Sequence, residues 1–309
     1  MDNRVKPLEG VRNFRDFGGY EGVDGARIRS GKLYRSGHFG EASDNDLAAI
    51  DLFNITLQAD LRRPDERERH GDKWPVKGVH QLYSDLGRET DAPHVNFLRQ
   101  VAIDADSSRG WMRDYYINAP YRPALVETYT AWFDRLAGLD ADKAALVNCA
   151  AGKDRTGILC ALTHHALGVS MDDIFIDYEL TNTAASVEDR LPEAAAYFND
   201  MLSKNFDDAV YQPFVGVDRE FLEAAIAAIK DESGDARNMT AATTSRSCPM
   251  RPIGMQSRAH CLNALSSNIG TVMGVSMNVG ATLFTRIPRD ASSTPIDFVN
   301  PSTACFVMQ

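Results

Sequence analysis

A cysteine, a lysine, an aspartate and an arginine lie close together in residues 149–157, which read CAAGKDRTG. The apolar run AALVN (144–148) precedes this segment, and a helical pattern of apolar residues follows it. A strand that turns tightly into a helix directs several unpaired backbone N–H groups to one point, where the helix dipole also favours negative charge. The segment therefore predicts a binding site for a tetrahedral anion.

The side chains of this segment suit a phosphate group. The small residues Ala150, Ala151 and Gly152 let the backbone curl closely around the anion, and Arg155 offers a planar, charged fork for two phosphate oxygens. The same surroundings favour the thiolate form of Cys149. A thiolate beneath a bound phosphate is an in-line nucleophile, which implies a cysteinyl-phosphate intermediate.

Two carboxyl groups are candidates for the proton donor that a phosphate ester needs when its bond breaks. Asp154 lies beside the arginine in the segment, and Asp60 follows the strand pattern NITLQA, at the edge of the sheet where α/β sites usually lie. Asp154 could instead anchor the loop backbone, and Asp60 could form a salt bridge or cap a helix before Pro64. Thr156 could hydrogen-bond the thiolate, cap the following helix, or do both.

The remaining chemistry in the sequence excludes several other classes of protein. The nucleotide-binding pattern GxxxxGK[ST] does not fit, because Lys153 is followed by Asp154. The cysteines form no CxxC pair and no zinc spacing, and their odd number suits a reducing compartment. We therefore expect neither a metal nor a cofactor. The five cysteines are Cys149, Cys160, Cys248, Cys261 and Cys305.

The composition of 44% hydrophobic and 25% charged residues is typical of a soluble globular protein. The net charge of −10 argues against nucleic-acid binding. The sequence contains no apolar stretch long enough to insert into a membrane, and its first residues lack the apolar region of a secretory signal. We expect a cytoplasmic protein, or one secreted by a route without a signal peptide.

Strand and helix patterns alternate along residues 1–236, which indicates an α/β fold with a central, mostly parallel sheet flanked by helices. The segment 13–37 has the glycines and aromatic residues of short strands and turns. Periodicity and caps predict the other elements. The expected strands are 54–61, 78–86 and 144–148, and the expected helices are 43–53, 120–139, 156–168, 171–183, 187–205 and 218–233.

The composition changes near Gly234. Residues 237–309 contain six arginines and two aspartates, no lysine or glutamate, and six of the ten methionines. No amphipathic helix pattern runs through them. We therefore divide the chain into a catalytic domain, 1–236, and an atypical C-terminal extension, 237–309. The extension is interpreted as a flexible appendage or as an out-of-frame C-terminus.

The segment CAAGKDRTG resembles the Cys-x5-Arg signature of Cys-dependent protein-tyrosine phosphatases. It is similar in particular to an atypical bacterial family that acts on phosphotyrosine and, in some members, on phosphoinositides. The segments GVRNFRDFGGY (10–20), GKLYRSG (31–37) and ADLRRPDERE (59–68) resemble the N-terminal pattern of that family in the same order. The resemblance covers roughly residues 7–235. One departure is Asn148, which stands where the family usually has histidine.

The resemblance implies a protein-tyrosine-phosphatase-like fold with a helical lid and a phosphorylated protein or a phosphoinositide as partner. Phosphotyrosine is the main expected substrate, with phosphoserine, phosphothreonine and phosphoinositides as further ones. It favours Asp154 over Asp60 as the general acid. It also places an additional positive charge at Lys153. The implied substrate-binding residues are Ala150, Ala151, Gly152, Lys153 and Gly157, and we expect Asn13, Arg15 and Asp16 to brace the fold or the loop by hydrogen bonds.

Two other functions remain as alternatives. In the first, Asn148 has weakened the thiolate, and the protein is a pseudophosphatase that binds phosphate without turnover. In the second, the cysteine belongs to a rhodanese-like or arsenate-reducing enzyme. The sequence Arg155-Thr156-Gly157 and the lack of an evident resolving cysteine make the second alternative a poorer match.

Overall fold

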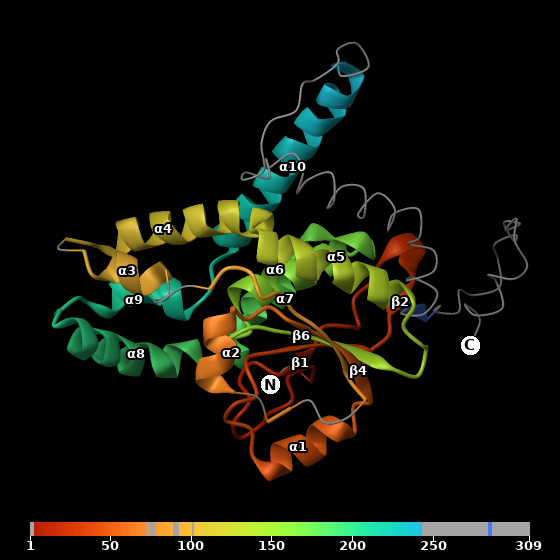
Figure 1. Ribbon diagram of the computed structural model, residues 1–309, viewed down its shortest axis with the longest axis horizontal. Helices are drawn as coiled ribbons and strands as arrows, with labels where there is room; N and C mark the ends of the chain where they lie inside the picture. Colours follow the sequence, from red (N-terminus) through yellow and green to blue (C-terminus); the bar gives the residue numbers. More distant parts are fainter. Residues whose placement is uncertain are drawn as a thin grey trace, which may run out of the picture.

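A five-stranded sheet forms the centre of the computed structural model, with the strand order β1-β3-β6-β4-β5 (Figure 1). The structure describes residues 3–71, 73–74, 78–88, 93–100, 102–242 and 284–285. The pair β1–β3 is antiparallel, and the other three pairs are parallel. The strands are β1 (Arg15–Asp16), β3 (Leu33–Ser36), β4 (Ile55–Asp60), β5 (His80–Leu82) and β6 (Ala144–Asn148).

Strand β6 lies in the middle of the sheet, and all five of its residues are buried. Such a continuous apolar run suits a parallel strand that is covered on both faces. Its last residue, Asn148, is in register with Ser36 of β3 and with Asp60 of β4. Three parallel strands thus end at one edge of the sheet, and the cysteine segment begins there.

The two faces of the sheet carry separate parts of the core. Ala145, Val147 and Cys149 belong to the larger hydrophobic cluster, which includes residues from the helices α4, α5, α6, α7 and α10. Ala144 and Leu146 point to the other face and pack in a smaller cluster with residues around α1. This alternation follows from the two-residue period of a strand. The mostly parallel α/β architecture predicted from the sequence is confirmed.

The helices agree with the sequence patterns in most places. The pattern predicted Ser43 or Asp44 as the cap of α1, and the structure has Ser43, which accepts from the amide of Asp46 while the Asp46 carboxylate accepts from the Ser43 amide. The helices are α1 (Asp44–Asp51), α2 (Pro64–His70), α3 (Pro93–Leu98), α4 (Ala105–Asn118), α5 (Pro123–Ala137), α6 (Asp154–Ala166), α7 (Met171–Ala184), α8 (Val187–Leu202), α9 (Asp208–Val215) and α10 (Arg219–Ala242), with short 3-10 turns at Val23–Gly25 and Ala119–Tyr121.

Two differences concern the helices. Helix α6 begins at Asp154, not at residue 156, so Asp154 and Arg155 lie in its first turn and Thr156 is not its cap. The position before the helix is Lys153, whose side chain makes no capping hydrogen bond. The sequence analysis also missed α3, α4 and α9. Helix α9 contains Pro213, and α4 has a polar composition with a central glycine, so neither has a strong helical pattern.

Helices α3, α4, α8 and α9 gather beside the sheet, at the left of Figure 1. A third hydrophobic cluster holds them together, with Phe97, Leu98, Ala195, Val210 and Tyr211 at its centre. This group has its own apolar core and meets the rest of the domain through α10 and the cysteine segment. The helical lid that the resemblance implies stays a prediction.

The expected domain boundary at residue 236 falls within α10, which extends as one helix away from the sheet (Figure 1). Within 237–309, the short strand β7 (Phe284–Thr285) pairs antiparallel with β2 (Arg27–Ile28). The rest of the extension beyond Ala242 lies outside the described residues, so the interpretation of 237–309 stays a prediction. Among the helices that the structure describes, none has the length and apolar character to cross a membrane.

Candidate active site

Residues 149–153 form a tight loop between β6 and α6. Gly152 adopts φ +67°, and a Cβ atom at this position would lie 2.3 Å from the carbonyl carbon of Ser36. Any other residue would therefore clash with the end of β3. Gly152 allows the loop to turn sharply against the neighbouring strand, as the sequence analysis expected of a small residue here.

The carbonyl groups of the loop and the first turn of α6 are held by surrounding residues. The Gly152 carbonyl accepts from Asn13 Nδ2 at 2.7 Å and from Arg35 NH2 at 3.2 Å. The Ala150 carbonyl accepts from the His38 amide at 3.2 Å, and the Arg155 carbonyl accepts from the Tyr129 hydroxyl at 3.2 Å. These contacts come from four residues in three separate parts of the chain, and they fix the peptide planes of the loop.

The amide groups of residues 150–156 are different. None of them donates a hydrogen bond to a residue that the structure describes. Consecutive amides that are left free in a turn before a helix form a concave anion-binding site, and the helix dipole adds to it. These amides are therefore available to an anion that binds in the loop.

Arg155 is oriented by a carboxylate that the sequence analysis missed. Its NH1 donates to Leu61 O at 2.9 Å and to Glu66 Oε2 at 2.6 Å, while NH2 donates to Glu66 Oε1 at 2.9 Å. Burial raises the pKa of Glu66, but Arg155 outweighs this effect by its charge and hydrogen bonds and lowers the pKa to about 2. The segment RRPDERE contains three acidic residues, Asp65, Glu66 and Glu68, and nothing in its pattern distinguishes Glu66 as the partner of Arg155.

The pairing with Glu66 leaves a defined edge of Arg155 open. A guanidinium has five N–H donors, and the three hydrogen bonds use both hydrogens of NH1 and one of NH2. Nε–H and the second hydrogen of NH2 donate to no described residue. These two donors point from the same edge of the planar group, so they can bind two oxygens of one phosphate.

Cys149 lies at the base of the loop, and only 2% of its surface is exposed. The hydroxyl of Thr156 in the first turn of α6 is fully buried and makes no hydrogen bond within the described part of the chain. A buried hydroxyl without a partner is unusual in a native structure and calls for an explanation. A hydrogen bond to the sulfur, as expected from the sequence, would provide one.

The two candidate acids have different surroundings. Asp154 keeps 23% of its side chain exposed, and its Oδ1 accepts from the Tyr116 hydroxyl at 2.8 Å. Tyr178 donates in turn to the Tyr116 oxygen at 2.8 Å. Burial raises the pKa of both tyrosines well above the usual value, so both stay protonated. Tyr116 thus orients Asp154 and leaves its second carboxylate oxygen available.

Asp60 is 2% exposed and is fully engaged by Arg62. Its Oδ2 accepts from Arg62 NH2 at 2.7 Å, and its Oδ1 accepts from the amide and Nε of the same residue at 3.1 and 3.0 Å. This geometry agrees with the salt bridge that the sequence left open as the alternative role. Asp60 has no acceptor site that faces the loop and is free of these partners.

Asn148 belongs to the same buried network. Its Nδ2 donates to Asp60 Oδ1 at 3.3 Å, and its Oδ1 accepts from Gln58 Nε2 at 2.9 Å. Gln81 continues the chain by donating to Gln58 at 2.9 Å. The side chain therefore reaches across β4 rather than to the loop backbone, and both of its polar atoms have partners.

Lys153 is buried and points toward the C-terminal end of α9. Its ammonium group donates to the carbonyls of Phe214 and Gly216, each at 2.8 Å, and lies 3.3 Å from Asp154 Oδ1. The acceptors are at the C-terminal end of α9, where the helix dipole attracts a cation. A role for Lys153 in substrate binding stays a prediction, and in this structure the residue connects the loop to α9.

The last two predicted substrate-binding residues contribute through the backbone or through packing. Ala151 is exposed at the loop surface with its amide free, whereas the Gly157 amide donates to Lys153 O at 2.7 Å. A Cβ atom on Gly157 would lie 2.9 Å from the Tyr178 ring. Close packing of α6 against α7 therefore explains this glycine without a contact to a ligand.

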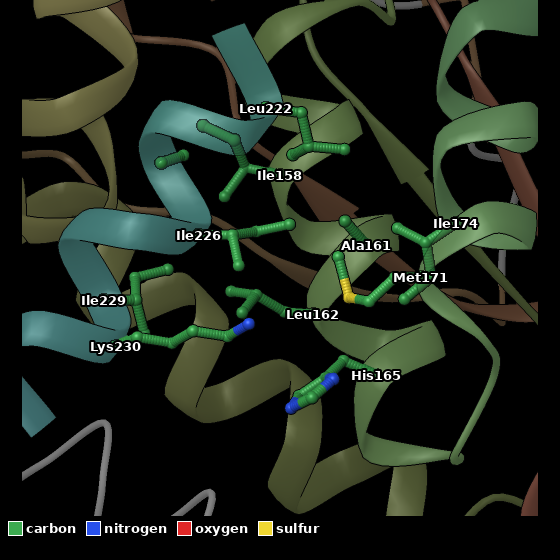
Figure 2. Close-up of a pocket in the computed structure, with 11 residues that line it drawn as sticks. Ile158, Ala161, Leu162, His165, Met171, Ile174, Leu222, Ile226, Ile229 and Lys230 are labelled. Atoms are coloured by element: carbon green, nitrogen blue, oxygen red, sulfur yellow. The ribbon is translucent and has the colours of Figure 1, made fainter. Parts of the chain in front are cut away.

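A separate apolar cavity lies between α6, α7 and α10 (Figure 2). Leucine, isoleucine and alanine side chains line most of it, with His165 and Lys230 at one end. None of the residues 149–157 borders this cavity, and its apolar lining does not suit a phosphate. Within the described residues, no group of three potential metal ligands is found. The candidate active site is therefore the loop around Cys149.

A buried cysteine, free amides and an oriented arginine define the class of cysteine-based phosphate-binding loops. The model of the tyrosine phosphatase family matches residues 6–245. The chain is 30% identical over 239 residues to a protein of Cupriavidus necator that is named as a tyrosine-protein phosphatase, a match that covers 74% of this chain and 80% of that protein. It is also 30% identical over 263 residues to the triple specificity protein phosphatase PtpB of Mycobacterium tuberculosis, and this match covers 74% of this chain and 90% of that protein. The chain belongs to the tyrosine phosphatase family.

Proposed function

We propose that the protein hydrolyses phosphotyrosine through a cysteinyl-phosphate intermediate on Cys149. The observation that carries the proposal is the ring of free amides at 150–156 around the cysteine, together with the open edge of Arg155. These donors match the three non-bridging oxygens of a phosphate monoester. They stabilise the negative charge of the transferring group and hold phosphorus in line with the sulfur.

The reaction has two steps. The Cys149 thiolate attacks phosphorus, the P–O bond to the tyrosine breaks, and Asp154 donates its proton to the departing oxygen. Water then attacks the phosphorus, the S–P bond breaks, and Asp154 takes a proton from the water. Thr156 donates a hydrogen bond to the sulfur as its charge returns. Asp154 is the first choice for this role because it keeps a free oxygen, whereas Asp60 is bound to Arg62.

We propose a broader substrate range that includes phosphoserine, phosphothreonine or phosphoinositides. The name of the mycobacterial relative, which describes a triple specificity, supports this proposal. Lys153 is the candidate for a second phosphate of such a substrate, provided that it leaves the carbonyls of α9. Turnover of a panel of phosphopeptides and phosphoinositides by the wild type and by Lys153→Met tests the range. A selective loss on phosphoinositides is the expected result, and an equal loss on every substrate would contradict this role of Lys153.

The covalent mechanism is tested with Cys149→Ser. We expect no turnover of phosphotyrosine and retained binding of inorganic phosphate, because the amides and Arg155 remain. Acid quenching of the wild type during turnover should trap phosphate on the protein, and the variant should trap none. Cys160→Ala is the matched control, since this buried cysteine lies in the second turn of α6, outside residues 149–157, and its loss should leave turnover intact. Near wild-type turnover by Cys149→Ser would contradict the mechanism, and phosphate binding without turnover by the wild type would indicate a pseudophosphatase.

The proposed reaction uses no metal, because Arg155 and the amides supply the positive charge. We expect the same turnover with and without EDTA. Loss of activity in EDTA that returns with a divalent cation would contradict this part of the proposal. Location in the cytoplasm, or secretion without a signal peptide, stays a prediction from the sequence.

A further inference from the structure

Two arginines lie buried directly beneath the loop, on the segments of the N-terminal pattern that the catalytic steps do not use. Arg15 of β1 and Arg35 of β3 are opposite each other in the antiparallel register, and neither has any exposed surface. Like charges directly opposite on neighbouring strands repel each other, and burial adds a desolvation cost. The fold therefore keeps an arrangement that is unfavourable for stability.

One carboxylate serves both arginines. Asp177 of α7 accepts from Arg35 NH1 at 2.8 Å, and its other oxygen lies 3.6 Å from Arg15 Nε. Burial, together with the neighbouring Arg35, lowers the pKa of Arg15 to about 9, so both guanidiniums are charged at neutral pH. Attraction by the arginines outweighs the effect of burial and lowers the pKa of Asp177, which stays ionised. The cluster of Arg15, Arg35 and Asp177 carries one net positive charge.

The other charges near Cys149 occur in balanced pairs. Arg155 pairs with Glu66, Lys153 with Asp154, and Arg62 with Asp60. Asp16 lies on the opposite face of β1, bound by the amides of Gly18 and Gly31, and burial raises its pKa although these amides and Lys6 act in the other direction. The remaining titratable neighbours are uncharged near neutral pH because burial shifts their pKa values, and they are Tyr115, Tyr129, Cys160 and His164.

The cluster is connected to the loop by hydrogen bonds. Arg35 donates to the Gly152 carbonyl at 3.2 Å, and Asn13, which donates to the same carbonyl at 2.7 Å, accepts a hydrogen bond from Arg15. Burial lowers the pKa of Arg35, but Cys160, Asp177 and Cys149 raise it, and the net shift is upward. Arg35 is also in parallel register with Val147, and Val147 and Cys149 face the same part of the core, so the buried guanidinium lies close to the cysteine.

We propose that Arg15 and Arg35 are positioning residues of the phosphatase loop, which fix its Gly152 carbonyl and supply one uncompensated positive charge behind Cys149. This charge stabilises the thiolate before catalysis and the phosphate dianion after binding. The cluster also ties the loop to α7, because Arg15 donates to Thr181 Oγ1 at 3.1 Å and to the Asp177 carbonyl at 2.8 Å. The inference rests on the proposed role of Cys149 as the nucleophile.

The test measures the rate of Cys149 alkylation by iodoacetamide against pH in the full chain, without turnover. Arg35→Gln removes the excess charge and should move the alkylation midpoint up by about one pH unit, which is a tenfold change in thiolate fraction below the midpoint. It should also weaken the binding of inorganic phosphate. Arg35→Lys keeps the charge and should stay closer to the wild type. Arg27→Gln removes an exposed charge from β2 and should leave the midpoint unchanged.

Asp177→Asn separates an electrostatic role from a structural one. It leaves both arginines without a carboxylate, so the midpoint should move down, opposite to the effect of Arg35→Gln. Near-UV circular dichroism identifies the folded variants. Where Arg35→Gln does not fold, Arg15→Gln removes the same charge without touching the Gly152 carbonyl. Equal upward shifts in all these variants, or no shift in Arg35→Gln and Arg15→Gln, would overturn the inference. Turnover by Cys149→Ser would instead contradict the proposed function.

Discussion

Two aspartates lie near the loop, one at the end of β4 and one at the start of α6, and their burial and hydrogen-bond partners differ. Asp60 at the end of β4 is buried and receives four hydrogen bonds at 3.1 Å or less from Arg62. Asp154, after β6, keeps a fifth of its side chain exposed and is oriented by one tyrosine hydroxyl. A fixed ion pair holds the sheet edge together, whereas a carboxyl group with one free oxygen can exchange a proton with a substrate.

The largest expected effect is on catalysis at Asp154. Asp154→Asn should lower kcat/KM for phosphotyrosine about 10²- to 10⁴-fold, because the leaving oxygen departs without a proton. An activated aryl phosphate, whose leaving group needs no proton, should lose much less. The unfolding free energy should change little, since Tyr116 can still donate to the amide oxygen. An equal loss on both substrates would mean that Asp154 shapes the loop and is not the acid.

The matching variant Asp60→Asn should act mainly on stability. It leaves the buried Arg62 without its carboxylate, and breaking a buried ion pair costs about 3–5 kcal/mol. Urea unfolding followed by circular dichroism measures this loss. The ratio of activities on phosphotyrosine and on the activated aryl phosphate should stay that of the wild type. A change in this ratio larger than that of Asp154→Asn would make Asp60 the acid.

The Arg155–Glu66 pair predicts a smaller effect that depends on pH. The pKa of Glu66 is lowered from 4.5 to about 2 in the folded state, so the unfolded chain binds the proton more tightly. This pair therefore stabilises the fold fully above pH 4.5, and its contribution is lost as pH falls from there toward 2. The contribution is on the order of a few kcal/mol.

Glu66→Gln should remove this part of the pH dependence and lower kcat/KM, because Arg155 loses its orientation. Unfolding free energies measured between pH 7 and pH 3 test the first point. Glu188→Gln, at an exposed position in the first turn of α8, is the control and should follow the wild type. An unchanged slope in Glu66→Gln would show that the ion pair does not contribute to stability in this range.

The smallest effect is expected at Asn148. Asn148→His replaces a side chain that lies between Gln58 and Asp60 with a titratable ring, and we expect the pH profile of Cys149 alkylation to shift by less than one unit. The acidic limb of kcat/KM should move with it. Gln81→Met cuts the outer end of the same network and should leave the profile unchanged. Identical profiles for Asn148→His and the wild type would mean that this position does not tune the nucleophile.

The sequence by itself determined the nature of the site. The apolar run 144–148, the small residues after the cysteine and the helical pattern that follows permit only a strand, a tight loop and a helix, because these are local properties of the backbone. The residues Cys149, Gly152 and Arg155 therefore carried enough information to predict phosphate chemistry. The same applies to α1 and α5, whose cap and apolar spacing are encoded within single segments.

Only the tertiary structure decided which partner each charged group receives. Glu66 orients Arg155 across 89 positions of the chain, and Asp177 meets Arg35 across 142. Such pairs leave no periodicity in the sequence, because they arise where separate elements pack together. The surroundings of Asp60 and Asp154 were decided in the same way, and burial and hydrogen-bond partners, rather than residue type, determine whether a carboxylate is suited to an ion pair or to proton transfer.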